Sequence, residues 1–172
     1  MLSAPDIASL LYLHLHPADP YSAMAERLGI SKSTAHGSVQ RLIKNRLVHR
    51  SARAMGTVAQ GPALDFLSYG VPYAFAPNIV PVARGVVTGL RALDGGGMNS
   101  FAGASALVWP SKLDDQMGVG IEPLVPAAPD IVHRDPPLYR MLAIVDALRV
   151  GDAREREVAR EALQREFTLS TP

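Results

Sequence analysis

Three short segments at the start of the chain carry apolar residues at helical spacing, and turn residues separate them. The first is expected to begin at Pro5, which suits a first helical turn, and to end before Pro17. Residues 21–28 predict a second helix. A third is expected over residues 32–45, with Ser31 as the N-cap that accepts a backbone hydrogen bond. Three helices therefore occupy about the first 45 residues.

Two short extended pieces follow these helices, at residues 47–50 and 56–59, with a polar tip between them. This pattern predicts a β-hairpin. Pro62 then opens another short helix, which Gly70 ends, because glycine adopts the left-handed conformation that helix ends favour. We therefore expect a first domain over residues 1–60.

The middle of the chain, residues 71–137, carries nine prolines and the run Gly95-Gly96-Gly97. Such a composition favours turns and short strands over long helices. The glycine run is predicted to be a flexible turn. Brief apolar pieces that could form the strands lie at residues 83–90, 106–109 and 119–125.

Two amphipathic segments at the end of the chain predict a helical hairpin. The first apolar stripe consists of Leu138, Met141, Leu142, Val145 and Leu148, and the second of Val158, Ala159, Ala162, Leu163 and Phe167. The expected fold class is thus mainly α with short β: N-terminal helices and hairpin, a small Pro/Gly-rich middle region with short strands, and a C-terminal helical hairpin. Residues 61–172 would form the second part, for dimerisation or for partner or ligand binding.

The composition restricts the class of protein. An apolar content of 48% and a net charge of +1 suit a folded soluble chain. The absence of cysteine excludes disulfide scaffolds, thiolate metal sites and cysteine nucleophiles, and it permits a reducing cytoplasm. The apolar stretch at residues 7–15 is far shorter than the roughly 20 residues that cross a bilayer. We expect a cytoplasmic protein with no membrane partner.

The small net charge conceals an uneven distribution of charged residues. Residues 1–53 hold seven basic and three acidic side chains. Six of these seven basic residues lie between Ser31 and Arg53, where no acidic residue occurs. Solvated helix faces usually mix both signs, as residues 154–166 do. The acid-free run is therefore predicted to neutralise phosphates on a polyanion, with a solvated helix face as the alternative.

The segment from Met24 to Val48 resembles the helix–turn–helix of winged-helix transcription regulators, particularly the multiple-antibiotic-resistance repressor (MarR-like) family. Ala25 stands where a small residue lets the two helices touch. The remaining correspondences are the turn Leu28-Gly29-Ile30-Ser31, the core positions Val39 and Leu42, and the wing start Leu47-Val48. The resemblance covers about 50 residues. It departs from the family at Gly37 and Ser38, where longer side chains are usual, and at Asn45-Arg46, which replaces a glycine-containing turn.

A recognition helix of this kind presents its N-terminal part to base edges in the major groove. Gln can form two hydrogen bonds with adenine and Arg with guanine, so Gln40 and Arg41 are candidate base readers. Lys44, Arg50 and Arg53 are better placed to contact phosphates, which position a protein without reading sequence. The full set of predicted DNA-binding residues is Ser31, Lys32, Ser33, Thr34, His36, Gln40, Arg41, Lys44, Arg50 and Arg53.

The resemblance implies a sequence-specific transcription regulator that binds double-stranded DNA as a homodimer, and by analogy a repressor. A single winged helix reads only a few base pairs, so two copies on half-sites about 10 bp apart are expected. We expect residues 137–167 to form the dimer interface, with packing against the first helix as a competing use. Three alternatives stay open: an antitoxin-like or adaptor protein that binds a partner protein through its second half, a winged helix used only for docking, and an enzyme that carries such a module.

Other constellations are weaker candidates for chemistry. His14 and His16 diverge by about 200° on a helix and cannot chelate one ion. The carboxylates Asp114, Asp115 and Glu122 show no spacing that would supply six oxygens to a cation. Ser105, Ser111, His133 and Asp135 form no hydrolase motif. We therefore expect no catalytic residue, no metal and no cofactor.

Six of the ten aromatic residues lie between Phe66 and Trp109. They could line a ligand pocket, or they could form the core on which short strands pack. We favour the core, because a region with few long helices needs large side chains to bury enough area. Trp109 in particular is predicted to be buried, since its neighbours Val108 and Pro110 offer no polar reason for exposure.

Overall fold

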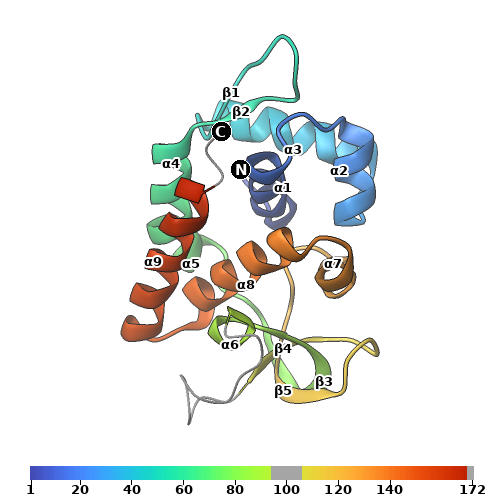
Figure 1. The fold of residues 1–172 in the computed structure, drawn as a ribbon, viewed down its shortest axis with the longest axis vertical. Coiled ribbons are helices and arrows are strands. Elements are labelled where there is room, and N and C mark those ends of the chain that lie inside the picture. Colours follow the sequence, from blue (N-terminus) through green and yellow to red (C-terminus); the bar gives the residue numbers. More distant parts are fainter. Residues whose placement is uncertain (94–105, 170–172) are drawn as a thin grey trace.

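Helices dominate the computed structural model, which describes residues 1–93 and 106–169, and the strands form two small sheets (Figure 1). The chain begins with three helices and a short antiparallel hairpin that pairs Val48 with Val58. These elements are α1 (Ala4–Leu15), α2 (Tyr21–Leu28), α3 (Lys32–Lys44), β1 (Val48–His49) and β2 (Thr57–Val58). The helices and the hairpin predicted from the first 60 residues are confirmed.

Local interactions explain where these helices begin and end. Ser3 and Asp6 form a capping box at the start of α1. The Ser31 side chain accepts a hydrogen bond of 3.0 Å from the backbone N–H of Thr34 at the start of α3. Gly29 ends α2 with a φ of 65°, the left-handed conformation that glycine adopts without strain.

Replacing Gly29 with alanine is expected to lower the free energy of unfolding by about 2 kcal/mol. The new Cβ would occupy a left-handed conformation and would lie 2.8 Å from the Cβ of Ala127. Urea denaturation checks this loss. Gly61→Ala is the matched control, because its Cβ would meet no atom within 4 Å, and it should leave stability unchanged or raise it by up to about 1 kcal/mol. Equal stability of the two variants would contradict the close packing of Gly29 against Ala127.

The middle of the chain combines short helices with a three-stranded sheet. It contains α4 (Gln60–Asp65), the π-helical turn η1 (Phe66–Gly70), α5 (Val71–Ala74), β3 (Ile79–Thr88), α6 (Leu90–Leu93), β4 (Leu107–Pro110) and β5 (Gln116–Ile121). Each strand pairs with the other two, and β4 and β5 run parallel. This tight arrangement requires glycine at position 85, where a Cβ would lie 2.0 Å from the Trp109 carbonyl oxygen. The predicted short strands are confirmed, whereas the run Gly95-Gly96-Gly97 lies outside the described residues.

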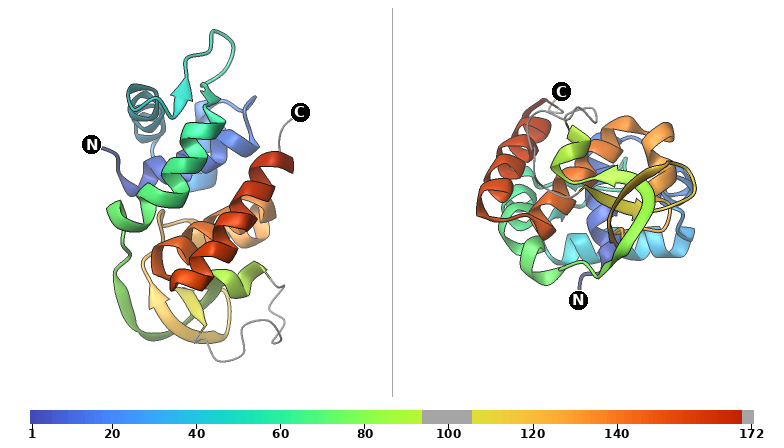
Figure 2. Two further views of the ribbon diagram at one scale, coloured as in Figure 1. Left: turned by 90° about the vertical axis from the view of Figure 1, so that its left-hand side faces the viewer. Right: turned by 90° about the horizontal axis from the view of Figure 1, so that it is seen from below.

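The C-terminal part consists of α7 (Ala128–Arg134), α8 (Pro136–Val150) and α9 (Ala153–Leu169). Helices α8 and α9 form the predicted hairpin (Figure 2), and α8 also packs against α1. The apolar stripe of α8 is buried against α1, α7 and α9 within one chain. The buried residues of α9, from Ala159 to Phe167, belong to the same core. The chain itself covers both stripes, so the competing use of the hairpin, packing against the first helix, is the one that the structure has, and a dimer interface on these stripes loses its premise.

One hydrophobic core extends through both of the predicted domains. Ile7 and Leu11 of α1, Leu42 of α3, Ile144 of α8 and Phe167 of α9 all belong to it. Residues 1–60 and 61–172 thus share buried surface. Within the described ranges, no helix is long and apolar enough to cross a membrane.

A buried polar cluster joins α8 to the three-stranded sheet. Asp146 accepts hydrogen bonds from Thr88 (2.9 Å), from the indole of Trp109 (2.6 Å) and from Arg149 (2.6 Å). Burial raises the pKa of Asp146, and these hydrogen bonds together with the charge of Arg149 oppose that shift. Trp109 is 1% exposed, so its predicted burial is confirmed. This cluster anchors the strands on the central helix.

The middle aromatic residues divide between core and surface. Phe66 and Phe75 meet edge to face at 6.5 Å and pack against the core. Tyr69 and Tyr73 are exposed, and the guanidinium groups of Arg160 and Arg156 lie over their rings. Tyr69 and Tyr73 therefore contact α9, whereas Phe66 and Phe75 pack on the core; Phe101 lies outside the described residues.

Candidate nucleic-acid interface

Helix α3 has one buried face and one face open to solvent. Ala35, Val39 and Leu42 lie in the core. The predicted contact residues Ser33, His36, Gln40 and Lys44 recur every three or four positions and so share the opposite face. Lys32, Ser33, His36 and Lys44 are exposed, and Gln40 is half-buried. The structure thus brings five of the predicted contact residues together on the outer surface of α3.

Ser31 and Thr34 lie at the start of the same helix, where their side chains already have partners. Their hydroxyl oxygens are 2.8 Å apart, and the Ser31 oxygen also caps the helix. Ser31 is nevertheless exposed and Thr34 partly so. Both residues therefore stand at the end of α3 that a groove-binding helix would present first, and their main role in the free protein is to define where the helix begins.

Arg41 has a different role from the base reading expected of it. Its guanidinium makes two parallel hydrogen bonds to the carboxylate of Asp6, from Nε at 2.8 Å and from Nη2 at 2.7 Å. Asp6 is fully buried, and burial alone would raise its pKa. The hydrogen bonds from Arg41, Ser38 and the backbone of Ser3 outweigh burial and hold that pKa below its ordinary value. Arg41 therefore joins α3 to α1, and its fork is occupied.

Replacing Arg41 with methionine is expected to cost roughly 2–4 kcal/mol of folding stability, because it strands the Asp6 carboxylate in the core without its cation. Chemical denaturation measures the loss. Lys44→Met on the exposed face of α3 is the control and should change stability by less than about 0.5 kcal/mol. The double variant Asp6→Leu/Arg41→Met should recover much of the loss, since it removes both charges. A single Arg41 variant as stable as the parent chain would show that the pair contributes nothing.

The hairpin loop adds further cations beside α3. Arg50 and Arg53 are exposed in the loop between β1 and β2. The hairpin packs on α3 through β1. Arg46 is also exposed and has a φ of 62°, an unusual conformation for a residue with a side chain. The sequence analysis counted Arg46 in the acid-free run without assigning it a DNA contact. Its position between Lys44 and the hairpin could have indicated such a contact.

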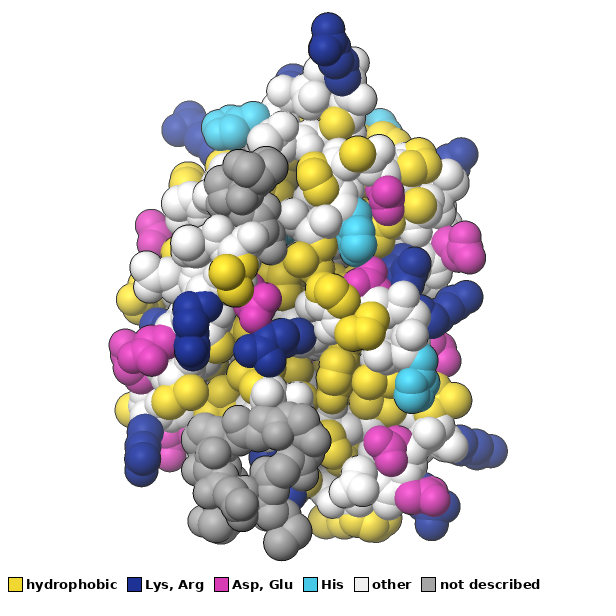
Figure 3. Space-filling view, in the orientation of Figure 1, with side chains coloured by type: hydrophobic (Ala, Val, Ile, Leu, Met, Phe, Trp, Pro, Cys, Tyr) yellow, Lys and Arg dark blue, Asp and Glu magenta, His cyan; other side chains and the backbone are white. Residues whose placement is uncertain are grey.

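The electrostatics of this end of the molecule differ from those of the rest. Seven ion pairs occur among residues 1–93 and 106–169, and only the pair Arg41–Asp6 involves the run from Ser31 to Arg53. In Figure 3, the top of the molecule, where the hairpin loop lies, carries Lys and Arg side chains, and acidic side chains lie lower. We call the exposed cations Lys32, Lys44, Arg46, Arg50 and Arg53 the basic face.

An aromatic side chain borders this basic face. The ring of Tyr21, at the start of α2, lies 5.2 Å from the ring of His36 on α3. The sequence analysis missed Tyr21 as a neighbour of the predicted contact residues, because the packing of α2 against α3 determines its position beside His36. The contact limits the orientations open to His36 and places a hydroxyl-bearing ring beside it.

The histidines considered for a metal site have separate structural roles. His14 is buried and stacks on Phe167 at 4.0 Å, and burial lowers its pKa. His16 lies 2.8 Å from the Asp135 carboxylate. Across the part of the chain that the structure describes, no group of three or more potential metal ligands is found.

Comparisons of the chain with protein-family profiles, with curated proteins and with solved structures found no match.

Proposed function

We propose that this protein is a transcription regulator that binds double-stranded DNA in a sequence-specific manner, with α3 in the major groove and the β1–β2 loop along the backbone. The observation that carries the proposal is the basic face, whose five exposed cations have no ion-pair partner among the described residues. Cations that lack internal partners are available to phosphates. The resemblance of residues 24–48 to a winged helix–turn–helix supports the same arrangement.

The contacts divide into two groups under this proposal. Ser33, His36 and Gln40 lie on the outward face of α3 and would read base edges. Lys44, Arg50 and Arg53 would contact phosphates, and Arg46 joins them. Arg41 is removed from the base-reading group, because Asp6 occupies its guanidinium. Two copies on adjacent half-sites would supply the selectivity that one helix lacks, with repression as the expected outcome.

The salt dependence of binding tests the phosphate contacts. Fluorescence anisotropy with a mixed-sequence 30-bp duplex should show an affinity that falls steeply between 50 and 200 mM salt, with close to one unit of log–log slope for each phosphate neutralised. Lys44→Ala, Arg50→Ala and Arg53→Ala should each reduce the slope by about one unit. Lys112→Ala, which removes an exposed cation in the β4–β5 loop, is the matched control. Absence of binding at low salt would refute the proposal.

Selection of bound duplexes from a random library tests base reading. The parent protein should enrich a motif, and Gln40→Ala should relax the preference at one base position by about 1–3 kcal/mol while leaving binding to random duplex unchanged. Lys44→Ala should weaken all duplexes alike. If both variants behave identically on the selected motif and on random duplex, the outward face of α3 does not read sequence.

A further inference from the structure

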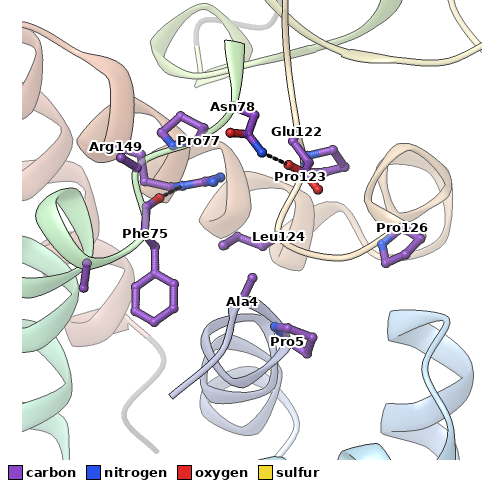
Figure 4. A pocket seen from close by; sticks show the side chains of 12 residues that line it. Ala4, Pro5, Phe75, Pro77, Asn78, Glu122, Pro123, Leu124, Pro126 and Arg149 are labelled. Carbon is purple, nitrogen blue, oxygen red and sulfur yellow. Dashed lines mark hydrogen bonds between the residues drawn. The ribbon is translucent and has the colours of Figure 1, made fainter. Parts of the chain in front are cut away.

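A pocket of about 560 Å³ lies among segments far apart in the sequence. Its walls come from the first turn of α1, from the segment that joins α5 to β3, from the segment that joins β5 to α7, and from Arg149 near the end of α8. Figure 4 shows Arg149, Asn78 and Glu122 along one side of the pocket, and Phe75, Ala4 and Pro5 along another. Apolar walls with a few convergent polar groups are typical of small-molecule sites.

The pocket is held in shape by hydrogen bonds between its walls. Asn78 donates from Nδ2 to Oε2 of Glu122 at 2.6 Å, and the Glu122 backbone N–H donates to the Asn78 carbonyl at 3.1 Å. Arg149 donates from Nε to the Phe75 carbonyl at 2.7 Å. The two loops are therefore fixed to each other and to α8 before any ligand enters, which lowers the entropic cost of binding.

Arg149 supplies hydrogen-bond donors to the pocket. Its side chain is 95% buried, with Nε bonded to Phe75 and Nη1 bonded to Asp146. Its remaining terminal nitrogen, Nη2, makes no hydrogen bond within the described residues, and Arg149 is one of the residues that line the pocket. Further along the same polar wall, the hydrogen bond between Asn78 and Glu122 leaves two oxygens free to accept, Oε1 of Glu122 and Oδ1 of Asn78.

The charges select the class of ligand. Asp146 balances the charge of Arg149, so an anion would gain little from the guanidinium and would meet the carboxylate of Glu122. A cation such as an ammonium carries donors only, so it would leave Nη2 of Arg149 without an acceptor. A neutral group that both accepts and donates satisfies both sides at once. We propose that this pocket binds a small, neutral ring compound that carries a carboxamide-type group, with its C=O toward Arg149, its N–H toward Glu122 and its ring against Phe75 and the prolines.

Three ring probes that differ only in their polar group test the proposal on the full chain. Benzamide, benzoate and benzylamine are titrated into ¹⁵N-labelled protein. Benzamide should shift the amide resonances of Phe75, Asn78 and Leu124 in a saturable way with a Kd on the order of 1 mM, as expected for so small a molecule. Benzoate and benzylamine should bind at least about fivefold more weakly, because benzoate meets the Glu122 carboxylate and benzylamine leaves Nη2 of Arg149 without an acceptor.

Glu122→Ala provides the matched variant, because Glu122 is exposed and its loss leaves the core intact. It should weaken benzamide binding about tenfold, the cost of losing one hydrogen bond to a charged acceptor. Asp115→Ala, an exposed carboxylate that is not part of the pocket, should leave the Kd unchanged. No saturable shift, a tighter complex with either charged probe, or an unchanged Kd in Glu122→Ala would overturn the proposal.

Discussion

A chain that ends at Asp135 is expected to be unfolded. Removing residues 136–172 deletes α8, in which ten residues are buried, together with α9, and so removes the part of the core that packs against α1. Six of these are Leu, Met, Ile or Val. Fully burying such a side chain contributes about 1.5–3 kcal/mol, so the loss is on the order of 10 kcal/mol. A domain of this size has a total stability of about 5–15 kcal/mol.

Circular dichroism and a ¹H–¹⁵N NMR spectrum measure this outcome. The shortened chain should show no cooperative thermal transition and little dispersion of amide resonances. A chain that ends at Leu169 retains all of α9 and serves as the control, with spectra like those of the parent. A truncated protein that melts cooperatively would show that the N-terminal helices form a core of their own, and that α8 only covers them.

Asp146→Ala is expected to lower the free energy of unfolding by about 3–5 kcal/mol and the Tm by about 10 °C. The substitution leaves three donors without their acceptor in the core: the Thr88 hydroxyl, the Trp109 indole and the Arg149 guanidinium. Stranding a buried charge costs more than the net contribution of the pair, because the guanidinium cannot regain its water. The largest part of the loss should therefore come from Arg149.

Differential scanning calorimetry measures the change, and Asp115→Ala is its control. Asp115 also pairs with an arginine, but both partners are largely exposed, so its loss should change stability by no more than about 0.5 kcal/mol. A second variant, Asp146→Ala/Arg149→Met, should regain part of the lost stability, since no buried charge remains. An unchanged Tm in Asp146→Ala would mean that the cluster does not hold the sheet on α8.

Much of the secondary structure could be predicted because its signals are local. The capping residues Ser31 and Gly29, and apolar spacing over one or two turns, act within a few residues of each other. The outward face of α3 could be predicted for the same reason, since helical periodicity alone separates Ser33 and Gln40 from the buried Val39. The burial of Trp109 could be predicted from its apolar neighbours, but its hydrogen bond to Asp146 could not.

Tertiary structure alone decided which polar residues are used inside the molecule. Arg41 looked like a base reader, but Asp6, 35 positions earlier, holds it, and no local pattern indicates such a pairing. The apolar stripe of α8 was predicted to bind a second copy of the chain, but α1, α7 and α9 cover it within one chain. A periodic apolar stripe indicates that one face of a helix is buried, but it does not indicate which element covers that face. The sequence alone determines the basic composition of residues 31–53. The ion-pair partner of each charge depends on the packing of segments that are distant along the chain.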